Sequence, residues 1–268
     1  MESGKWWDAY YLKHGHTGCA DPTVYAYNQP LKIRAVARCI PAGTGRALDI
    51  GCGTGDVVAV LRSKGYSVVG IDVSNAVARD TARRFAGDPQ VSIRPSSLAE
   101  VSGAFDLITS VTVMQHVPDA ELLEALRRLH APTLVALEIA PVDRFGESGQ
   151  GVIERTASEW RALFLRAGWS VSAERTFAPW GPVLVIRLNR LVNRAFAGRT
   201  ASSAALALSA QSNAVETATL KRRILRWGYR AARGFLLWLG RPLDALGLQA
   251  PWAYYRIFVL TRATRGAG

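Results

Sequence analysis

From residue 45 onward, short apolar runs alternate with longer segments in which apolar residues recur every three or four positions. The apolar runs predict strands near residues 46–50, 67–72, 91–94, 105–111, 133–140 and 170–176. The segments between them predict helices near residues 56–64, 74–86, 119–130 and 156–167. Strands that alternate with helices in this way are typical of a parallel sheet with helices on both faces.

The alternation ends after the sixth predicted strand. A run rich in aromatic and β-branched residues at 254–260 predicts one more strand, whereas residues 183–250 are rich in Ala, Leu and Arg and predict helix. We therefore expect an α/β fold with a doubly wound, mostly parallel, seven-stranded sheet and a helical insertion before the last strand. In an alternative, residues 183–188 pair with the sixth strand through a turn at 179–182, and the insertion becomes a C-terminal extension.

A glycine-rich turn follows the first predicted strand, in the sequence LDIGCGTG at residues 48–55. Glycine adopts positive φ without steric cost and lets a ligand approach the backbone amides closely, so such a turn suits the polar end of a ligand. The spacing Gly51-x-Gly53-x-Gly55 is one residue tighter than the GxGxxG of dinucleotide sites, which argues against NAD. Asp72, at the end of the second strand, suits the hydroxyls of a ribose.

These residues resemble the first motif of the class I S-adenosylmethionine-dependent methyltransferases, in the branch that acts on small molecules. The resemblance continues through three later segments, at residues 105–110, 114–119 and 156–168. It implies a Rossmann-like fold, S-adenosylmethionine as the cofactor, and transfer of a methyl group as the activity.

The resemblance also implies which residues hold the cofactor. The turn and Asp49 would contact the methionine part, and Asp72 would bind the ribose hydroxyls. Many members of the family carry an acid after the third strand for the adenine amino group, but this chain has Ser97 and Leu98 there, so we transfer the adenine contact to those two positions. The full expected set is Asp49, Gly51, Cys52, Gly53, Gly55, Asp72, Val73, Ser97, Leu98 and Gln115.

This assignment divides the chain into four parts. An aromatic and helical cap segment occupies residues 1–42, and the Rossmann-like core that binds the cofactor occupies residues 43–182. A basic helical insertion at 183–250 serves as a lid or side domain, and residues 251–268 hold the final strand that completes the sheet.

Methyl transfer to a hydroxyl depends mainly on alignment of the reacting atoms, together with a base that removes the hydroxyl proton. His116 is a candidate base because it follows the fourth predicted strand, at the carboxyl edge where open α/β sheets bind ligands. A histidine that only packs the loop before Pro118 is an equally open interpretation. Glu138, an acid on an apolar strand, lies either near the acceptor or in an ion pair with Arg144 or Arg155.

The aromatic segment at residues 6–16 contributes further candidates, because similar segments in this family cover the cofactor and shape the acceptor pocket. A plain core cluster of Trp and Tyr is the alternative. We take His116, Glu138 and His14 as candidate catalytic residues, and Tyr11, Arg144 and Trp180 as candidate acceptor-binding residues. The expected acceptor is a small molecule or glycan, methylated on oxygen rather than on nitrogen or carbon.

The net charge of +12 is concentrated in the insertion. Between residues 222 and 239, five arginines fall within an arc of roughly 100° on a helical wheel, and apolar residues occupy the opposite side. In one interpretation the apolar side docks on the domain and the arginines face water. In the other, the arginines contact phosphates of a membrane surface or of an anionic or lipid-linked acceptor.

Several other classes of protein are disfavoured. Three cysteines without paired spacing indicate neither disulfides nor a structural zinc site, and no metal-binding cluster is evident. The N-terminal residues lack an export signal and no apolar run of about 18 residues occurs, so we expect a cytoplasmic protein, with peripheral contact at the inner membrane surface as an option. Nucleic acid is a disfavoured partner, because the tryptophans fall on the apolar side of the basic helix. An RNA methyltransferase and a non-catalytic cofactor-binding module stay open as alternatives, and the sequence indicates no oligomeric state.

Overall fold

The computed structural model describes residues 3–19, 21–141, 151–196, 220–251 and 254–262. Contacts within the chain divide it into two units. Unit 1 consists of Met1–Thr17, Lys32–Phe177 and Ala253–Gly268, and unit 2 consists of Gly18–Leu31 and Ala178–Trp252. The predicted start of the insertion, residue 183, lies five residues after the start of the second part of unit 2 at Ala178. The predicted cap segment 1–42 is divided between the two units.

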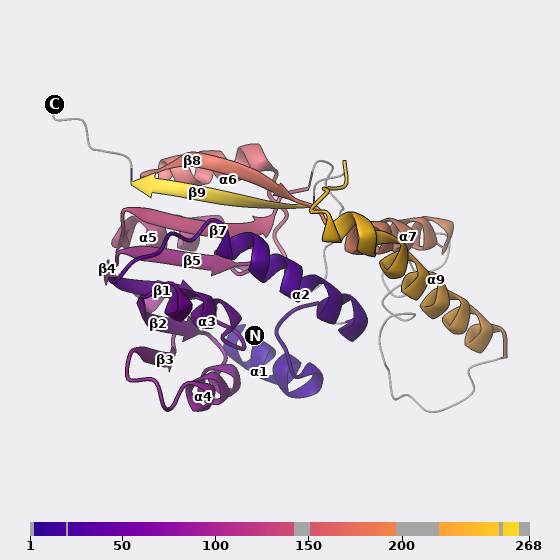
Figure 1. Cartoon of the computed structure of the whole chain (residues 1–268), viewed down its shortest axis with the longest axis horizontal. Helices are drawn as coiled ribbons and strands as arrows, with labels where there is room; N and C mark the ends of the chain where they lie inside the picture. Colours follow the sequence, from indigo (N-terminus) through magenta and orange to yellow (C-terminus); the bar gives the residue numbers. More distant parts are fainter. Residues whose placement is uncertain (1–2, 20, 142–150, 197–219, 252–253, 263–268) are drawn as a thin grey trace. The chain divides into compact units, whose positions relative to one another are not determined.

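Unit 1 is built on one sheet with the strand order β3-β2-β1-β5-β7-β9-β8 (Figure 1). Its strands are β1 (Arg46–Ile50), β2 (Ser67–Asp72), β3 (Val91–Pro95), β5 (Leu107–Val111), β7 (Thr133–Ile139), β8 (Trp169–Phe177) and β9 (Tyr255–Arg262). The first five strands in the sheet order pair in parallel, and β9 lies antiparallel between β7 and β8. The predicted fold class, a doubly wound and mostly parallel seven-stranded sheet, is confirmed.

The alternative in which residues 183–188 form a strand is wrong. Those residues lie within helix α7 (Trp180–Phe196), and the strand that pairs with β8 is β9. The aromatic and β-branched residues of β9 favour a strand, whereas the apolar residues of α7 recur at helical spacing.

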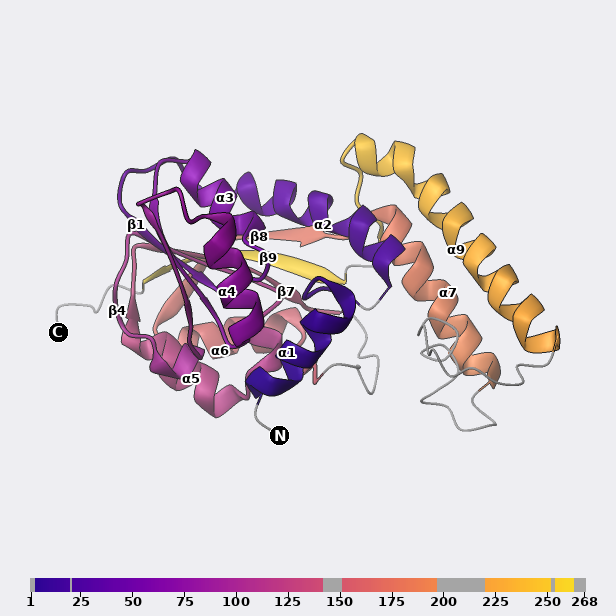
Figure 2. The same cartoon turned by 90° about the horizontal axis from the view of Figure 1, so that it is seen from below.

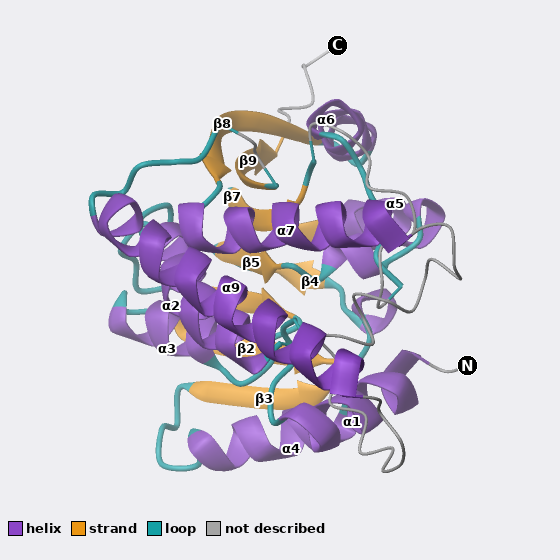
Figure 3. Ribbon diagram, turned by 90° about the vertical axis from the view of Figure 1, so that its right-hand side faces the viewer, coloured by secondary structure: helices purple, strands orange, loops and turns teal. Residues whose placement is uncertain are grey.

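Helices cover both faces of this sheet. They are α1 (Ser3–His14), α3 (Asp56–Ser63), α4 (Asn75–Arg84), α5 (Asp119–Arg128) and α6 (Ala157–Arg166). Figure 3 shows α3 on one side of the sheet and α5 and α6 on the other. Two short 3₁₀ turns, η1 (Leu98–Glu100) and η2 (Met114–His116), follow β3 and β5, and the short strands β4 (Gly103–Ala104) and β6 (Leu129–His130) pair with each other.

Local sequence accounts for the ends of these elements. In β1 the four residues from Ala47 to Ile50 are buried, as expected of a strand covered on both faces. The hydroxyl of Ser74 accepts a hydrogen bond from Val77 N and caps α4, and Thr156 forms a capping box with Glu159 at the start of α6.

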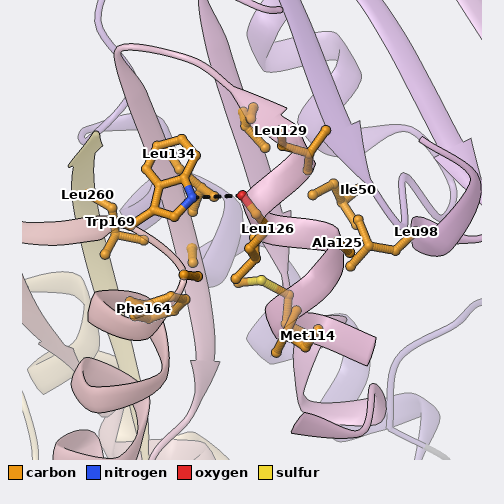
Figure 4. Packing of buried hydrophobic residues seen from close by; sticks show 14 of the residues in the cluster. Ile50, Leu98, Met114, Ala125, Leu126, Leu129, Leu134, Phe164, Trp169 and Leu260 are labelled. Carbon is orange, nitrogen blue, oxygen red and sulfur yellow. Dashed lines mark hydrogen bonds between the residues drawn. The ribbon is translucent and has the colours of Figure 1, made fainter. Parts of the chain in front are cut away.

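Large buried side chains, among them Trp169 and Phe164, pack between the sheet and helices α5 and α6 (Figure 4). The indole of Trp169 donates a hydrogen bond from Nε1 to Leu126 O (3.1 Å), so this buried polar group is satisfied. Met114, the first residue of η2, belongs to the same cluster. The core therefore also anchors the turn that carries His116.

Unit 2 contains the first part of α2 (Pro22–Ala37), α7 (Trp180–Phe196) and α9 (Leu220–Ala245). The helices α7 and α9 pack closely, because a Cβ on Gly240 would lie 2.3 Å from Gly181 N. Asp244 accepts hydrogen bonds from Gly181 N (3.1 Å) and from Tyr27 Oη (2.8 Å) and so fastens the first turn of α7. The insertion is helical over these residues, as predicted, and the helix expected over 204–219 lies outside the described residues.

Within unit 2, the described part of α9 does not pack through the apolar side of the helical wheel. Trp227 and Trp238 are exposed, whereas Arg233 pairs with Asp21 inside unit 2. The packing side carries the buried Leu237 instead. Among the residues whose structure is described, none of the helices combines the length and the apolar character needed to cross a bilayer.

Candidate cofactor and acceptor site

The glycine turn after β1 has the backbone geometry that its sequence predicts. Gly51, Gly53 and Gly55 have φ values of 63°, 51° and 84°, in the left-handed region that other residues rarely adopt. Space is limited as well, because a Cβ on Gly51 would lie 2.3 Å from Val113 Cγ2. The turn therefore brings bare backbone to the carboxyl edge of the sheet.

Asp72, the last residue of β2, fastens this turn. Its Oδ2 accepts a hydrogen bond from Gly53 N (3.0 Å), and its Oδ1 accepts one from Ser74 N (2.9 Å). Burial raises the pKa of the Asp72 carboxyl despite these two hydrogen bonds. The glycine turn and the ends of β1 and β2 thus form one connected structure.

Asp49 lies one layer deeper, inside β1. Its Oδ1 accepts a hydrogen bond from Thr109 Oγ1 (2.7 Å), and its buried Oδ2 has no hydrogen-bond partner among the described residues. The pKa of Asp49 is raised to about 7, mainly by burial and also by the nearby Asp72 and Asp56, against the lowering effect of the Thr109 hydrogen bond. The unsatisfied oxygen marks the polar end of the site, although Asp49 itself does not line the cavity described below.

Replacing Asp49 with Asn is expected to make stability less dependent on pH. Because the pKa of Asp49 rises from 3.8 to about 7 on folding, the folded state binds more protons between these values. The contribution of Asp49 to the free energy of unfolding is therefore present at acidic pH and is lost as the pH rises through 7. Between about pH 5 and pH 8 this loss amounts to about 2–3 kcal/mol, which urea unfolding of wild type and variant measures.

Asp88→Asn is the matched control for this experiment. A hydrogen bond from Arg62 holds the pKa of Asp88 below its usual value, so its proton binding changes on folding only at more acidic pH. The control should follow the wild type between pH 5 and pH 8. An Asp49→Asn variant that loses as much stability over this interval as the wild type would contradict the prediction.

A cavity of about 420 Å³ opens at the carboxyl edge of β1, β2 and β5. Part of its lining consists of predicted cofactor-binding residues, namely Gly51, Asp72, Val73, Ser97 and Leu98. The apolar side chains of Ile50 and Ile71, at the ends of β1 and β2, lie between them in the same lining. These five members of the predicted cofactor-binding set therefore line one cavity.

Another part of the lining comes from the segment that follows β5. It contains Thr112, Val113, His116 and Val117, and Trp7 of α1 lines the same cavity. The rings of Trp7 and His116 meet edge to face, with their centroids 5.1 Å apart. His116 therefore shares one cavity with the glycine turn and Asp72.

Glu138, buried in β7, holds the η2 turn in place. Its Oε1 accepts hydrogen bonds from Ser110 Oγ (3.0 Å) and from Met114 N (3.2 Å), and its Oε2 accepts one from Gln115 N (3.2 Å). A longer hydrogen bond comes from Val113 N (3.4 Å). Burial raises the pKa of Glu138 to about 7, against the lowering effect of these donors. Glu138 contacts backbone amides and does not line the cavity.

The alternative for Glu138, an ion pair with Arg155, is wrong. Arg155 is buried and contacts carbonyl groups of η2 and the residue after it, because it donates hydrogen bonds to Val117 O (2.6 Å) and Met114 O (3.3 Å), and it pairs with Asp119 (2.6 Å). The turn is thus held from two sides. The other suggested partner of Glu138, Arg144, lies outside the described residues.

Gln115 connects His116 to the sheet. Its side-chain Oε1 accepts a hydrogen bond from Ile139 N (3.0 Å), and its Nε2 lies 3.3 Å from His116 Nε2. Gln115 is buried and does not line the cavity, so its contact with the His116 ring comes from the protein interior.

The predicted adenine contact lies at the start of the 3₁₀ turn η1, whose acid, Glu100, is bonded within the turn. Glu100 turns back to accept hydrogen bonds from Ser97 N (3.0 Å) and Ser96 Oγ (3.0 Å), and so closes a capping box. Ser96, Ser97 and Leu98 remain in the cavity lining.

Several other predicted site residues lie away from the cavity lining. Cys52, Gly53 and Gly55 belong to the glycine turn but do not line the cavity, and Tyr11 and His14 lie on α1 outside the lining. Tyr11 donates a hydrogen bond from Oη to Asp80 (3.3 Å), and the ring of His14 lies against Tyr10. Burial lowers the pKa of His14. Trp180 belongs to unit 2, at the start of α7.

Sequence reasoning missed Trp7 although it singled out the aromatic segment. Asp8 fixes the rotation of α1, because its Oδ1 accepts hydrogen bonds from Ser74 Oγ (2.5 Å) and Ala76 N (2.9 Å) at the start of α4. Figure 2 shows α1 beside α4. Trp7, next to Asp8, is thereby placed in the lining of the cavity.

Thr112 is the second residue that the sequence did not indicate. It is the non-glycine residue with positive φ (59°) among the described residues, and it lines the cavity. A β-branched residue is disfavoured in this conformation, so no sequence signal points to it. Its backbone N donates a hydrogen bond to Leu137 O (2.7 Å), which holds the chain in this shape between β5 and η2.

Comparisons with known proteins agree with this architecture. The chain matches a family described as a methyltransferase domain over residues 25–178. It is 37% identical over 111 residues to a ubiquinone biosynthesis O-methyltransferase of Paracidovorax citrulli, a match that covers 38% of this chain and 46% of the relative. The chain thus spans about half the length of the curated relatives it matches.

Two solved structures share the fold at low sequence identity. An O-methyltransferase from a trans-AT PKS multienzyme of Brevibacillus brevis is 16% identical with a TM-score of 0.55, and the match covers 90% of this chain and 75% of that one. A cyclopropane synthase of Mycobacterium tuberculosis is 15% identical with a TM-score of 0.55, covering 87% of this chain and 84% of the other. Since the family match spans more than half of its length and the sheet agrees with it, this protein belongs to the methyltransferase-domain family.

Proposed function

We propose that the protein transfers the methyl group of S-adenosylmethionine to a hydroxyl oxygen of a small molecule, with His116 as the base that accepts the hydroxyl proton. The observation that carries the proposal is the single cavity that joins the glycine turn and Asp72 to His116. The O-methyltransferase name shared by the first curated relatives supports oxygen as the methylated atom.

The residues at the polar end of the cavity fit S-adenosylmethionine. Gly51 presents backbone without a side chain to the cavity, where an amide can meet a ligand, and an added Cβ would collide with Val113. The Asp72 carboxylate suits a ribose diol, and the buried Asp49 Oδ2 without a described partner suits a nearby positive charge. Ser97 and Leu98 supply a hydroxyl and an apolar surface for adenine.

When bound, S-adenosylmethionine supplies a methyl group on a positively charged sulfur. The protein then has to orient the acceptor hydroxyl and take up its proton. His116 lies at the end of η2, where Glu138 and Arg155 hold the turn and Gln115 holds the ring. Because its position is fixed in this way, His116 can accept the proton of the acceptor hydroxyl without a rearrangement of the turn.

The acceptor end of the cavity favours a neutral, largely apolar molecule. Its lining combines Trp7, Val113, Val117 and Pro118, and no Lys or Arg occurs among the described lining residues. Glu121 adds a carboxylate, which disfavours an acceptor with a phosphate or carboxylate of its own. We therefore expect a hydroxyl group on an apolar body, and a glycan fits this lining less well.

Isothermal titration calorimetry with S-adenosylmethionine, S-adenosylhomocysteine and NAD tests the cofactor. Transfer of isotope-labelled methyl groups to a panel of hydroxyl and amine compounds then tests the reaction. Binding of both adenosyl compounds and labelling of hydroxyl compounds support the proposal. Binding of NAD alone, or transfer to amines alone, overturns it. Cofactor binding without transfer to any compound or to a cell extract would identify a non-catalytic binding module.

Replacing Gly51 with Ala is expected to weaken binding of S-adenosylmethionine by at least about tenfold and to lower the free energy of unfolding by about 1–3 kcal/mol, because φ is positive and Val113 is too close. Gly247→Ala is a matched control, because Gly247 has φ of 73° but no atom within 4 Å of an added Cβ. The control isolates the cost of positive φ. Equal cofactor affinity of Gly51→Ala and wild type would contradict the role of the turn.

A further inference from the structure

We propose that unit 2 docks on the surface of an anionic lipid bilayer through one face of α9. The apolar face, as we call it, consists of Trp227, Phe235, Trp238 and Leu239, whose exposed fractions are 75%, 57%, 62% and 45%. The rings of Phe235 and Trp238 stack on each other at a centroid distance of 5.9 Å. The face therefore exposes several aromatic and aliphatic side chains along one side of the helix.

The apolar face follows from the geometry of the helix. At about 100° per residue, its four residues fall within an arc of about 120°. The opposite side carries Tyr229, Leu237 and Gly240, which are buried. This side packs against α7, because a Cβ on Gly240 would meet Gly181 and Tyr229 donates a hydrogen bond to Asn189; Figure 2 shows the two helices side by side. Among the described residues of unit 2, α7 occupies this side of α9 and the apolar face is exposed.

Further exposed apolar side chains follow the end of α9. Leu246 and Leu248 follow the helix directly and are 76% and 49% exposed. Soluble proteins rarely expose a contiguous apolar patch of this kind unless it has a function. The extension shows that the exposed side chains are not confined to one end of the helix.

The charge of α9 indicates lipid as the occupant. The helix contains seven Lys or Arg residues, one of which, Arg233, is paired with Asp21, and a single acidic residue, Asp244. Arg230 and Arg241 are exposed, and each lies three residues after a tryptophan of the apolar face, Trp227 and Trp238. Residues at this spacing are neighbours on a helix surface. Basic side chains beside an aromatic face complement the phosphates and the interface of an anionic bilayer.

A second copy of the chain is a less suitable occupant. Pairing two α9 helices through the apolar face would bring the same arginines of both copies together, and like charges in an interface oppose association. An anionic bilayer avoids this repulsion, because its phosphate groups carry the opposite charge. The helix would lie in the plane of the membrane surface, consistent with the finding that none of the described helices suits a bilayer-spanning segment.

Flotation of the full-length protein with vesicles tests the proposal. Vesicles of phosphatidylcholine with phosphatidylglycerol should carry the wild type upward, and vesicles of phosphatidylcholine alone should carry much less. Trp227→Ser with Trp238→Ser should reduce binding to the anionic vesicles by at least about tenfold, since two exposed aromatic anchors are lost. Binding by the wild type should also fall as the salt concentration rises.

The matched control replaces two exposed leucines of unit 1, Leu12→Ser with Leu165→Ser, which are 74% and 65% exposed on α1 and α6. This control should bind vesicles as the wild type does, and circular dichroism should show equal helix content in all proteins. The proposal is overturned if the wild type does not bind anionic vesicles or if the tryptophan variant binds them equally well. It is also overturned if light scattering finds a wild-type dimer that the tryptophan variant dissociates, because a second copy then covers the face. The test does not depend on the proposed methyl transfer, which is measured separately.

Discussion

Replacing His116 with Ala is expected to lower kcat by about 10²–10⁴-fold, which is the range that a positioned general base contributes. The affinity for S-adenosylmethionine should change by less than about threefold, because the cofactor contacts assigned to the glycine turn and Asp72 are untouched. His116 lies in the cavity lining, with its ring held by Gln115 and against Trp7. Steady-state rates with labelled cofactor, combined with calorimetry, separate the two effects.

Two variants sharpen this test. His130→Ala removes an exposed histidine at the end of β6, outside the cavity, and should leave kcat unchanged. His116→Gln keeps a hydrogen-bonding side chain of similar length but removes the basic nitrogen, so it should be as slow as His116→Ala. If the glutamine variant recovers most of the activity, or if both variants lose stability and cofactor affinity in proportion to rate, His116 only packs the loop.

Local patterns in the sequence predict the parts of this protein that depend on neighbouring residues. A covered parallel strand requires apolar residues on both sides, and a turn at positive φ requires glycine, so β1 and the turn beginning at Gly51 could be predicted. Asp72 could be predicted as well, because it ends the next strand along the chain, β2, at the same carboxyl edge of the sheet.

Residues whose role depends on distant parts of the chain were less predictable. Glu138 stands out as an acid in an apolar strand, but its partners are the amides of η2, which the sequence does not place beside it. In α1 the pattern marks several aromatic residues, and the contact of Asp8 with Ser74 decides that Trp7 rather than Tyr11 lines the cavity. For α9 the wheel separates two sides, and the close fit at Gly240 decides which one packs.

The same dependence on distant partners makes Glu138 the residue whose loss should disturb the structure most. Glu138→Ala is expected to lower the free energy of unfolding by about 3–5 kcal/mol, because it leaves a buried hydroxyl and the amides of η2 without an acceptor. Ser110 and Met114 would lose their buried acceptor, and the space of the carboxyl group would be empty. Urea unfolding measures the loss, and Glu124→Ala, an exposed acid on α5, should change stability by less than about 1 kcal/mol.

The loss of stability in Glu138→Ala should change with pH, whereas a purely steric loss would not. The pKa of Glu138 is about 7 in the folded protein against 4.5 in the unfolded chain, so its contribution to stability is greatest at acidic pH and declines as the pH rises through 7. The difference between wild type and Glu138→Ala should therefore be larger at about pH 6 than at about pH 8. A difference that stays constant or grows over this interval would contradict the raised pKa of Glu138.

Glu138→Gln separates support of the turn from overall stability. The amide oxygen can still accept from Ser110 and Met114, whereas the amide nitrogen cannot accept from Gln115 N. We expect an intermediate loss of stability and a fall in kcat without an equal rise in KM, because Gln115 and His116 shift at the end of the turn while the lining near the glycine loop is retained. Wild-type kcat in a Glu138→Gln variant that is measurably less stable would show that the carboxylate supports the fold alone and does not position His116.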